Sequence, residues 1–446
     1  MPEPLHEPNG VNGASGSRHL NVEPYDAGLH RVGTWQGYYV WRTRRRTRQG
    51  SDSRRDFLRS YLHVTTLSKS KRTVTLRFPD IDFQHTWNID DLPWAIFQRP
   101  DKKKYYYDLV TTLDPDLLAA VQPHLAEVSH HKSEEVRKIH RSSALSFLYI
   151  FLSIGSPAFH GCIYTLRSTI PIGAGLGSSA SIAVCLAAAL LLQLRTLSGP
   201  HPDQPPEEAR LQVERINRWA FVAEMCIHGN PSGVDNTVST QGKAVVFQRT
   251  DYGKPPAVHP LWDFPELPLL LVDTKQPKST AHEVKKVSRL RETHPKLIGN
   301  ILDAIDRATR TASELLEHPE FDSEDPEGLR KVGELMTINH GLLVALGVSH
   351  PRLERVRELP ERLARLETKL EAEGYERFET TLGGDGVGVL WPAVLKNGLE
   401  DDEEGGMEID VEKFLNAEGI AGVERLVGVD NAGRGEGWRF WSVESH

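Results

Sequence analysis

The sequence predicts an α+β fold, in which strands and helices alternate irregularly along one chain of 446 residues. Three observations lead to this prediction. The length is sufficient for two or three domains, each with its own core. Apolar residues make up 39% and charged residues 26% of the chain, which is ordinary for a globular protein. Segments with the two-residue alternation of strands occur between segments with helical periodicity.

The composition argues against several classes of protein. The formal net charge of -8 provides no general attraction to nucleic acid or to an anionic membrane. The three cysteines form no C-x-x-C pair, which argues against a disulfide scaffold or a zinc ribbon and suits a reducing compartment. No apolar stretch reaches the roughly 20 residues that a membrane helix needs, and the first thirty residues lack an apolar signal core. We therefore expect a cytoplasmic protein without a membrane partner.

Residues 1–56 differ from the rest of the chain. They are polar, carry no helical or strand period, and are predicted to be disordered. An arginine-rich run between Arg42 and Arg55 has two interpretations, a nuclear-targeting or nucleic-acid patch and a solvated basic tail. We favour the tail, so no nucleic-acid partner is expected.

A first domain is predicted over residues 57–262. β-branched and aromatic residues alternate with polar ones in its strands, whereas one helix is apolar nearly all round and is expected to be buried. Ser178 is expected to cap the helix that follows a glycine loop. The predicted strands are Tyr61–Leu67, Arg72–Phe78 and Gly161–Thr169, and the predicted helices are Ala144–Ile154, Ala180–Leu194 and Pro206–His228.

A second domain is predicted over residues 263–446. It begins with a short apolar strand, continues through charged amphipathic helices, and ends with a strand that glycines interrupt. An acidic insertion at Leu399–Ile409 is interpreted as an exposed loop. The strands are placed at Leu269–Asp273 and Phe378–Trp391, and the helices at Lys285–Glu317, Gly328–Leu346 and Leu353–Gly374.

The glycine loop within Pro171–Ser181 predicts a phosphate-binding site. Its glycines stand at alternate positions, which lets the backbone approach a ligand without clashes from Cβ atoms. The helix that follows provides free N–H groups and the positive end of its dipole. Ser178 and Ser179 place hydroxyl groups where a phosphate oxygen or Mg²⁺ would lie. Together these features predict a cradle for a triphosphate.

Three other interpretations of this loop exist. A Walker loop requires a lysine that is absent here. A Rossmann turn requires an acidic residue about 20 positions further on, and no Asp or Glu occurs between Gly173 and Pro202. The loop could also only turn the chain into a tightly packed helix, and this alternative stays open.

Two carboxylates follow the loop in sequence. Glu224 shares a helix face with Ala220 and Ala223, and an inward carboxylate needs a metal or a cation as partner. Alternatively, Glu224 neutralises a neighbour such as Arg218. Asp235 lies in a helix start of the type S-x-x-D, where it would face the helix dipole. Its functional interpretation is a carboxylate that orients or deprotonates an attacking hydroxyl.

These segments resemble the GHMP kinases, a family that includes galactokinases, homoserine kinases, mevalonate kinases and phosphomevalonate kinases. Pro171–Ser181 matches the second, ATP-binding motif of that family. The segment Ile227–Thr240, together with Asp273–Thr280 and Ile338–Val348, is similar to fungal mevalonate kinases in particular. The similarity extends over roughly residues 57–445.

The resemblance implies a two-domain GHMP kinase fold with ATP and substrate held between the domains, often in a homodimer. It implies phosphorylation of (R)-mevalonate by ATP and Mg²⁺ to 5-phosphomevalonate, in isoprenoid and sterol synthesis. Asp235 would be the catalytic residue, Ser179 and Glu224 would hold Mg²⁺, and Thr280 would lie near the substrate. The ATP-binding residues implied are Ser168, Gly173, Ala174, Gly175, Leu176, Gly177, Ser178 and Ser179.

The sequence departs from the family in two places. No segment of the type P-G-K…G-E-H precedes Phe57, so the lysine beside the catalytic aspartate is missing. A third motif of the type K-L-T-G-A-G-G-G-G is missing after Leu353, which predicts an incomplete second domain. We therefore expect impaired turnover. Two alternatives stay open, an inactive nucleotide-binding homologue and a gene model with incorrectly joined exons.

Overall fold

The structure is a computed structural model. It describes residues 39–40, 58–172, 175–248, 257–262, 264–274, 280–357, 369–390, 394–395, 407–427 and 438–441. The arginine-rich run, Gly173, Ala174 and most of the acidic insertion lie outside these residues. None of the described helices combines the length and apolar character of a membrane-spanning helix.

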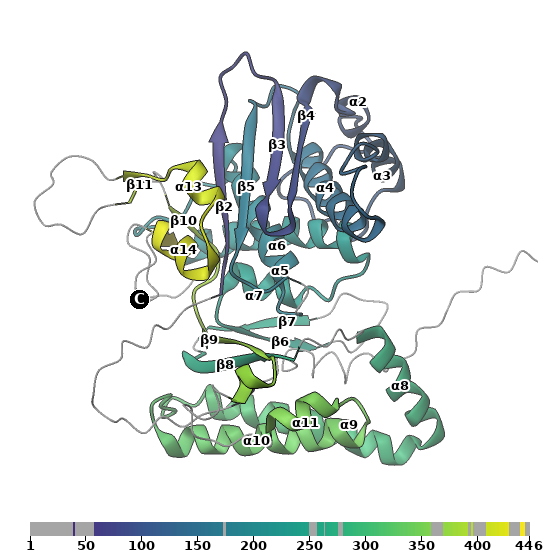
Figure 1. The fold of residues 1–446 in the computed structure, drawn as a ribbon, viewed down its shortest axis with the longest axis vertical. Helices are drawn as coiled ribbons and strands as arrows, with labels where there is room; N and C mark the ends of the chain where they lie inside the picture. The colour runs from purple at the N-terminus through teal and green to yellow at the C-terminus, as the bar shows by residue number, and fades with distance from the viewer. Residues whose placement is uncertain are drawn as a thin grey trace, which may run out of the picture.

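A four-stranded sheet forms the upper part of the molecule in Figure 1. Its order is β2 (Ser60–Thr66), β5 (Cys162–Ser168), β3 (Thr73–Phe78) and β4 (Phe83–Asn88). β2 and β4 are antiparallel to their neighbours, whereas β3 and β5 are parallel. The predictions of β2, β3 and β5 are confirmed, and β4 is an additional strand.

Three helices lie behind this sheet in Figure 1. They are α4 (Glu134–Ile154), α5 (Ser178–Gln193) and α6 (Pro206–His228). Their buried side chains form one core with the sheet, in which Trp219 and Phe147 are almost fully inaccessible. α6 has the predicted bounds because Pro206 stands in its first turn and Gly229, with φ of 75°, ends it.

Short elements complete this part of the chain. Single helical turns cover the sheet edge next to β4, and α7 follows α6 after a short turn. These short elements are η1 (Pro79–Ile81), η2 (Ile89–Asp91), α2 (Trp94–Phe97), α3 (Pro115–Val121), η3 (Gln122–Leu125) and α7 (Val234–Gln241).

The lower part contains two small sheets above a layer of helices (Figure 1). β6 (Ala244–Gln248) and β7 (Ala257–Leu261) form a hairpin, and β8 (Leu267–Asp273) pairs with β9 (Glu376–Leu382). β1 (Tyr39–Val40) occupies the other edge of β8. The prediction of disorder therefore does not hold at these two residues, because ladder hydrogen bonds to β8 satisfy their backbone.

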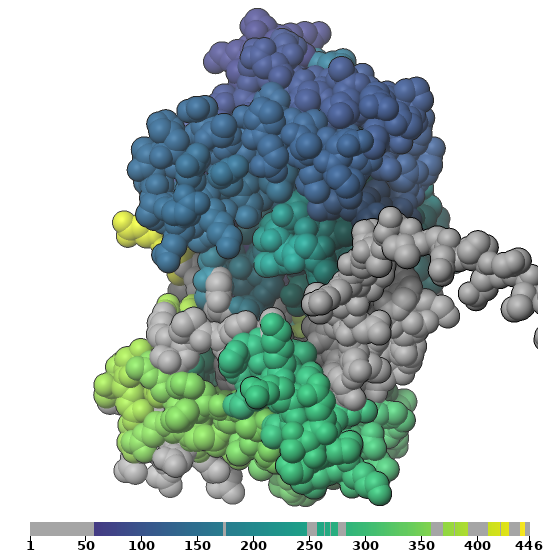
Figure 2. Space-filling view, turned by 90° about the vertical axis from the view of Figure 1, so that its right-hand side faces the viewer, coloured from purple at the N-terminus to yellow at the C-terminus, as the bar shows by residue number. Residues whose placement is uncertain are grey.

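The helical layer consists of α8 (Thr280–Thr293), α9 (Pro295–Leu316), α10 (Pro326–Ala345) and α11 (Pro351–Arg357). The prediction of a single helix over Lys285–Glu317 is wrong. The chain breaks at His294 because Pro295 has no N–H and begins a new helix at its first position. These helices form the green lower part of Figure 2.

The end of the described chain returns to the first sheet. β10 (Gly388–Leu390) pairs with β13 (Trp438–Phe440), and α13 (Val411–Leu415) and α14 (Gly419–Leu426) pack beside them. Two-residue strands β11 (Val394–Leu395) and β12 (Met407–Glu408) also pair. The loop prediction for Leu399–Ile409 is therefore wrong at Met407–Glu408. The mixture of helices and strands confirms the α+β prediction, and the boundary between residues 262 and 263 stays a prediction.

Arg167 joins these C-terminal helices to the sheet. Its side chain is almost fully buried and pairs with Asp80, with Nε and Oδ1 2.9 Å apart. The same guanidinium donates to the carbonyl oxygens of Phe414, Leu415 and Ala417. Arg167 thereby satisfies carbonyl groups at the end of α13 that have no partner within the helix.

Arg167→Met should lower the free energy of unfolding by about 3 kcal/mol, because it leaves a carboxylate and several carbonyl groups without their donor. Urea unfolding followed by tryptophan fluorescence measures this change. Arg330→Ala, which breaks only exposed pairs with Glu327 and Glu334 on α10, is the control and should leave the midpoint nearly unchanged. Equal effects of the two substitutions would contradict the anchoring role of Arg167.

Candidate active site

The glycine loop enters α5 through a left-handed turn. Gly175 and Gly177 have φ of 76° and 74°, a region that residues with a Cβ rarely adopt. Gly177 is the N-cap of α5, and Ser178 is its first helical residue. The prediction that Ser178 caps the helix is therefore wrong, because a capping serine needs an extended backbone and the chain arrives here with positive φ.

The same turn lies against Asp235. A Cβ atom on Gly177 would be 3.3 Å from Cβ and 3.5 Å from Cγ of Asp235. Asp235 is the second residue of α7, so the N-terminal ends of α5 and α7 meet at this point. Both ends carry free N–H groups and positive dipole ends, so the structure concentrates positive potential around one carboxylate.

A buried polar network fixes α7 relative to α6. Asn236 donates from Nδ2 to Oδ1 of Asn217 over 2.6 Å, and Asn217 donates to Oγ1 of Thr237 over 3.1 Å. Thr237 in turn donates to the carbonyl oxygen of Gly233 over 2.6 Å. Asn236 and Thr237 are both buried, so this network is shielded from water and orders the turn that carries Asp235.

Glu224 points from α6 toward the first turn of α5. Its Oε2 accepts a hydrogen bond from Oγ of Ser179 over 3.3 Å. Nε2 of His228 lies 3.2 Å from that hydroxyl and 3.8 Å from Oε2. Arg218 pairs with Glu214 instead. The alternative that Glu224 neutralises Arg218 is therefore wrong, and the predicted inward face is confirmed by burial of Glu224 with Ala220 and Ala223.

Burial by the surrounding protein raises the pKa of both carboxylates. Burial, together with the nearby charge of Asp235, raises the pKa of Glu224 to about 7, although the hydrogen bond from Ser179 lowers it. Burial also raises the pKa of Asp235, and the neighbouring His228 lowers it. The Asp235 side chain itself is exposed to the cavity, so the shift comes from the many protein atoms around the site and not from enclosure of the carboxylate.

The geometry fits a magnesium ion between Ser179 and Glu224. Oε1 of Glu224 is buried and has no hydrogen-bond partner among the described residues, so it can accept a cation. No group of three or more His, Cys, Asp or Glu side chains suited to a metal occurs in the described part of the chain. Magnesium suits such a site because it commonly takes one or two protein oxygens and completes its shell with phosphate oxygens and water.

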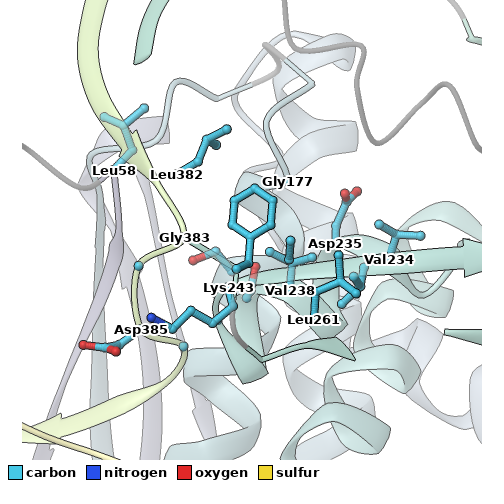
Figure 3. A pocket seen from close by; sticks show the side chains of 18 of the residues that line it. Leu58, Gly177, Val234, Asp235, Val238, Lys243, Leu261, Leu382, Gly383 and Asp385 are labelled. Carbon is cyan, nitrogen blue, oxygen red and sulfur yellow. The ribbon is translucent and has the colours of Figure 1, made fainter. Parts of the chain in front are cut away.

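A cavity of about 870 Å³ opens beside this cluster. Of the predicted residues, it is lined by Gly175, Leu176, Gly177 and Asp235. Figure 3 shows the last two. Ser168 lies at the end of β5, where its Oγ is 3.1 Å from Oγ of Ser60 and its N–H bonds to Asp80. Thr280 begins α8, and its side chain lies outside the described structure.

Three residues in or beside the site were missed from the sequence. His228 could have been found, because it is four residues after Glu224 on the same helix face. Lys243 and Asp385 also line the cavity. These two residues are 142 positions apart in the sequence, so no local pattern could have predicted that they share a cavity.

Comparisons with known proteins cover the part of the chain that contains this site. The model of the GHMP kinases N terminal domain matches residues 142–243, which include α5, α6 and α7. Mevalonate kinase ERG12 of Gibberella zeae is 70% identical over 418 residues, 87% of this chain and 82% of the relative. The chain belongs to the mevalonate kinase family. Within this family, mevalonate kinase erg12 of Aspergillus fumigatus is 60% identical over 413 residues, 86% of this chain and 76% of that protein.

Similarity within the mevalonate kinase family also reaches animals. Mevalonate kinase of Homo sapiens is 33% identical over 354 residues, which covers 78% of this chain and 80% of the human protein. The predicted resemblance to GHMP kinases, and to mevalonate kinases of fungi, is thereby confirmed.

Glu224→Gln should stabilise the metal-free protein above pH 7. Because burial raises the pKa of Glu224 from 4.5 to about 7, the folded state keeps a proton that the unfolded state loses within this window. The contribution of this group to stability is therefore complete below about pH 4.5 and is lost as the pH rises through 7. At pH 8 the variant should gain up to about 3 kcal/mol in free energy of unfolding.

Urea unfolding in EDTA at pH 5 and pH 8 measures this effect. Parent and variant should differ little at pH 5 and most at pH 8. Glu214→Gln, on the more exposed face of the same helix, is the matched control. A difference for Glu224→Gln that does not change between the two pH values would rule out a raised pKa.

Proposed function

We propose that this chain transfers the γ-phosphoryl group of ATP to the primary hydroxyl of (R)-mevalonate and forms 5-phosphomevalonate. The observation that carries this proposal is the close approach of Gly177 to Asp235, because a helix end with free N–H groups then lies beside a carboxylate. Membership of the mevalonate kinase family supports mevalonate as the acceptor. In this assignment ATP and mevalonate share the cavity beside the two helix ends.

The N-terminal end of α5 would bind the phosphates of ATP. Gly175 and Gly177 leave the backbone uncovered on the cavity side, and a Cβ on Gly175 would meet no atom within 4 Å. Free N–H groups at this end would donate to phosphate oxygens. Ser178 and Ser179 follow immediately and add hydroxyl groups, and Ser168, Gly173 and Ala174 complete the proposed ATP-binding segment.

Asp235 would orient the attacking hydroxyl and accept its proton. Its raised pKa, a result of burial, makes its carboxylate a better proton acceptor than an exposed aspartate. In phosphoryl transfer, positioning and electrostatic stabilisation supply most of the rate enhancement. The convergence of two helix ends around Asp235 supports both, because their positive ends would stabilise charge on the phosphoryl oxygens.

Ser179 and Glu224 would hold Mg²⁺. When bound there, the ion neutralises charge on the phosphate oxygens as transfer proceeds. Glu224 must lose its proton to act as a ligand, and its pKa of about 7 makes that loss dependent on pH near neutrality. His228, which lies beside both residues, orients the Ser179 hydroxyl. Thr280 is proposed as a substrate contact on the strength of its family position.

A second candidate function is nucleotide binding without catalysis. It is favoured by the absence of the first family motif, with its lysine, before Phe57 and of the third motif after Leu353. Loss of one preorganised electrostatic group costs about 10²–10³ in rate. Binding of MgATP without any phosphorylated mevalonate after long incubation would support this candidate. Formation of a homodimer and a cytoplasmic location stay predictions, which light scattering and microscopy of a tagged chain would test.

Asp235→Asn should abolish mevalonate-dependent formation of ADP while the affinity for MgATP stays nearly unchanged. The substitution removes the proton acceptor but keeps the side-chain volume against Gly177. A coupled ADP assay measures turnover, and isothermal titration measures MgATP binding. The control, Asp203→Asn, changes a highly exposed side chain that does not line the cavity and should behave like the parent. Comparable turnover of Asp235→Asn and the parent would remove Asp235 from the mechanism.

A further inference from the structure

Lys243 has an unusual backbone conformation for a lysine. Its φ is 56°, in the left-handed region that glycine adopts readily and long side chains rarely do. Among the described non-glycine residues, positive φ occurs also at Asp82, Ser129 and Arg195. Such a conformation is strained and persists only where the surroundings impose it.

A close backbone junction imposes this conformation. Lys243 donates its N–H to the carbonyl oxygen of Gly384 over 2.9 Å, and Val387 donates to the carbonyl oxygen of Thr240 over 3.0 Å. A Cβ on Gly242 would lie 2.3 Å from the backbone nitrogen of Gly386. The end of α7 and the glycine segment after β9 are therefore in direct backbone contact.

The junction directs the Lys243 side chain along the cavity. Lys243 lines the same cavity as Gly177 and Asp235. In Figure 3 it extends toward Asp385, and Asp235 lies on the opposite side of Val238. Glycine would fit this backbone without strain, so the presence of a lysine indicates that the side chain itself is used.

The ammonium group of Lys243 also lacks an ionic partner. In the described part of the chain, no carboxylate lies within ion-pair distance of it, including that of Asp385. Another cation of the cavity wall is engaged, because Arg310 pairs with Asp306 on α9. An unpaired ammonium group on a partly enclosed wall favours an anionic ligand.

We propose that Lys243 is an anion-binding residue of this cavity and that it holds an anionic oxygen group of a bound substrate. Both proposed substrates carry such a group, since mevalonate has a carboxylate and ATP has its phosphates. The inference rests on the proposed function for the identity of these ligands. The binding energy would offset the backbone strain at residue 243.

Lys243→Gly separates this role from a structural one. The substitution removes the ammonium group and at the same time relieves the left-handed strain, so the melting temperature should stay the same or rise. The affinity for one ligand should nevertheless fall by about tenfold or more, as expected for loss of a charged hydrogen bond. Lys243→Arg should retain affinity within about threefold, because it keeps the charge.

Isothermal titration with MgATP and, separately, with (R)-mevalonate distinguishes the two sources of the anion. A loss confined to mevalonate assigns Lys243 to the carboxylate, and a loss confined to MgATP assigns it to a phosphate. Arg195→Gly is the matched control, because Arg195 is also a left-handed cation, with φ of 55°, but does not line the cavity. It should gain stability without any change in affinity.

Lys243→Gln provides a second variant that keeps the backbone strain and a polar side chain, shorter by one atom, but removes the charge. If Lys243→Gln and Lys243→Gly both bind the two ligands as tightly as the parent, the proposal is overturned, whether or not the chain is active. If affinity falls in both variants while the parent forms no ADP with mevalonate, the inference about Lys243 stands and the proposed catalytic function fails.

Discussion

The close approach of Gly177 to Asp235 is the constraint on which the site depends. A Cβ built on Gly177 would lie 3.3 Å from Cβ of Asp235, so a side chain at residue 177 would push the carboxylate aside by a few tenths of an ångström. Only glycine combines that small size with the φ of 74° needed to enter α5. One residue type therefore sets the direction of the helix and its distance from the carboxylate.

The two carboxylates of the site differ in their exposure to solvent. Glu224 is buried, and this burial raises its pKa to about 7. One of its oxygens has no hydrogen-bond partner in the part of the chain that the structure describes. Asp235 faces the cavity and remains accessible to a ligand. A buried carboxylate with an unsatisfied oxygen is destabilising in the folded protein unless a cation occupies it. If Glu224 binds Mg²⁺ as proposed, the metal-free protein is destabilised by the group that binds the ion.

Glycines also allow a close backbone contact between the end of α7 and the segment after β9. Gly242 and Gly386 allow two backbones to approach so closely that a side chain on either would clash. This junction connects the helix that carries Asp235 with the strand pair β8 and β9, so the cavity has walls from both parts of the molecule. Arg167 performs a similar function at the other side, where it holds α13 to the first sheet.

The sequence by itself determined the elements around the phosphate loop, because local patterns control them. Pro206 and Gly229 mark the ends of α6 in the printed sequence, and Glu224 stands on the face that Ala220 and Ala223 bury. A local pattern gives the wrong answer where two residues could both begin a helix. Ser178 has a residue type that is typical of an N-cap, but Gly177 is the N-cap of α5. The amphipathic pattern likewise predicts one continuous helix across residue 295, but Pro295 divides that segment into α8 and α9.

Tertiary structure alone decided which distant residues share the cavity. Lys243 and Asp385 meet there because backbone hydrogen bonds between Thr240, Lys243 and the glycine segment join two remote parts of the chain. The partner of Arg167 at α13 was equally hidden, since it lies about 250 positions away. Periodicity and capping patterns depend only on residues that are close in sequence. The set of side chains that line a cavity depends on contacts between distant segments, which form only when the chain packs.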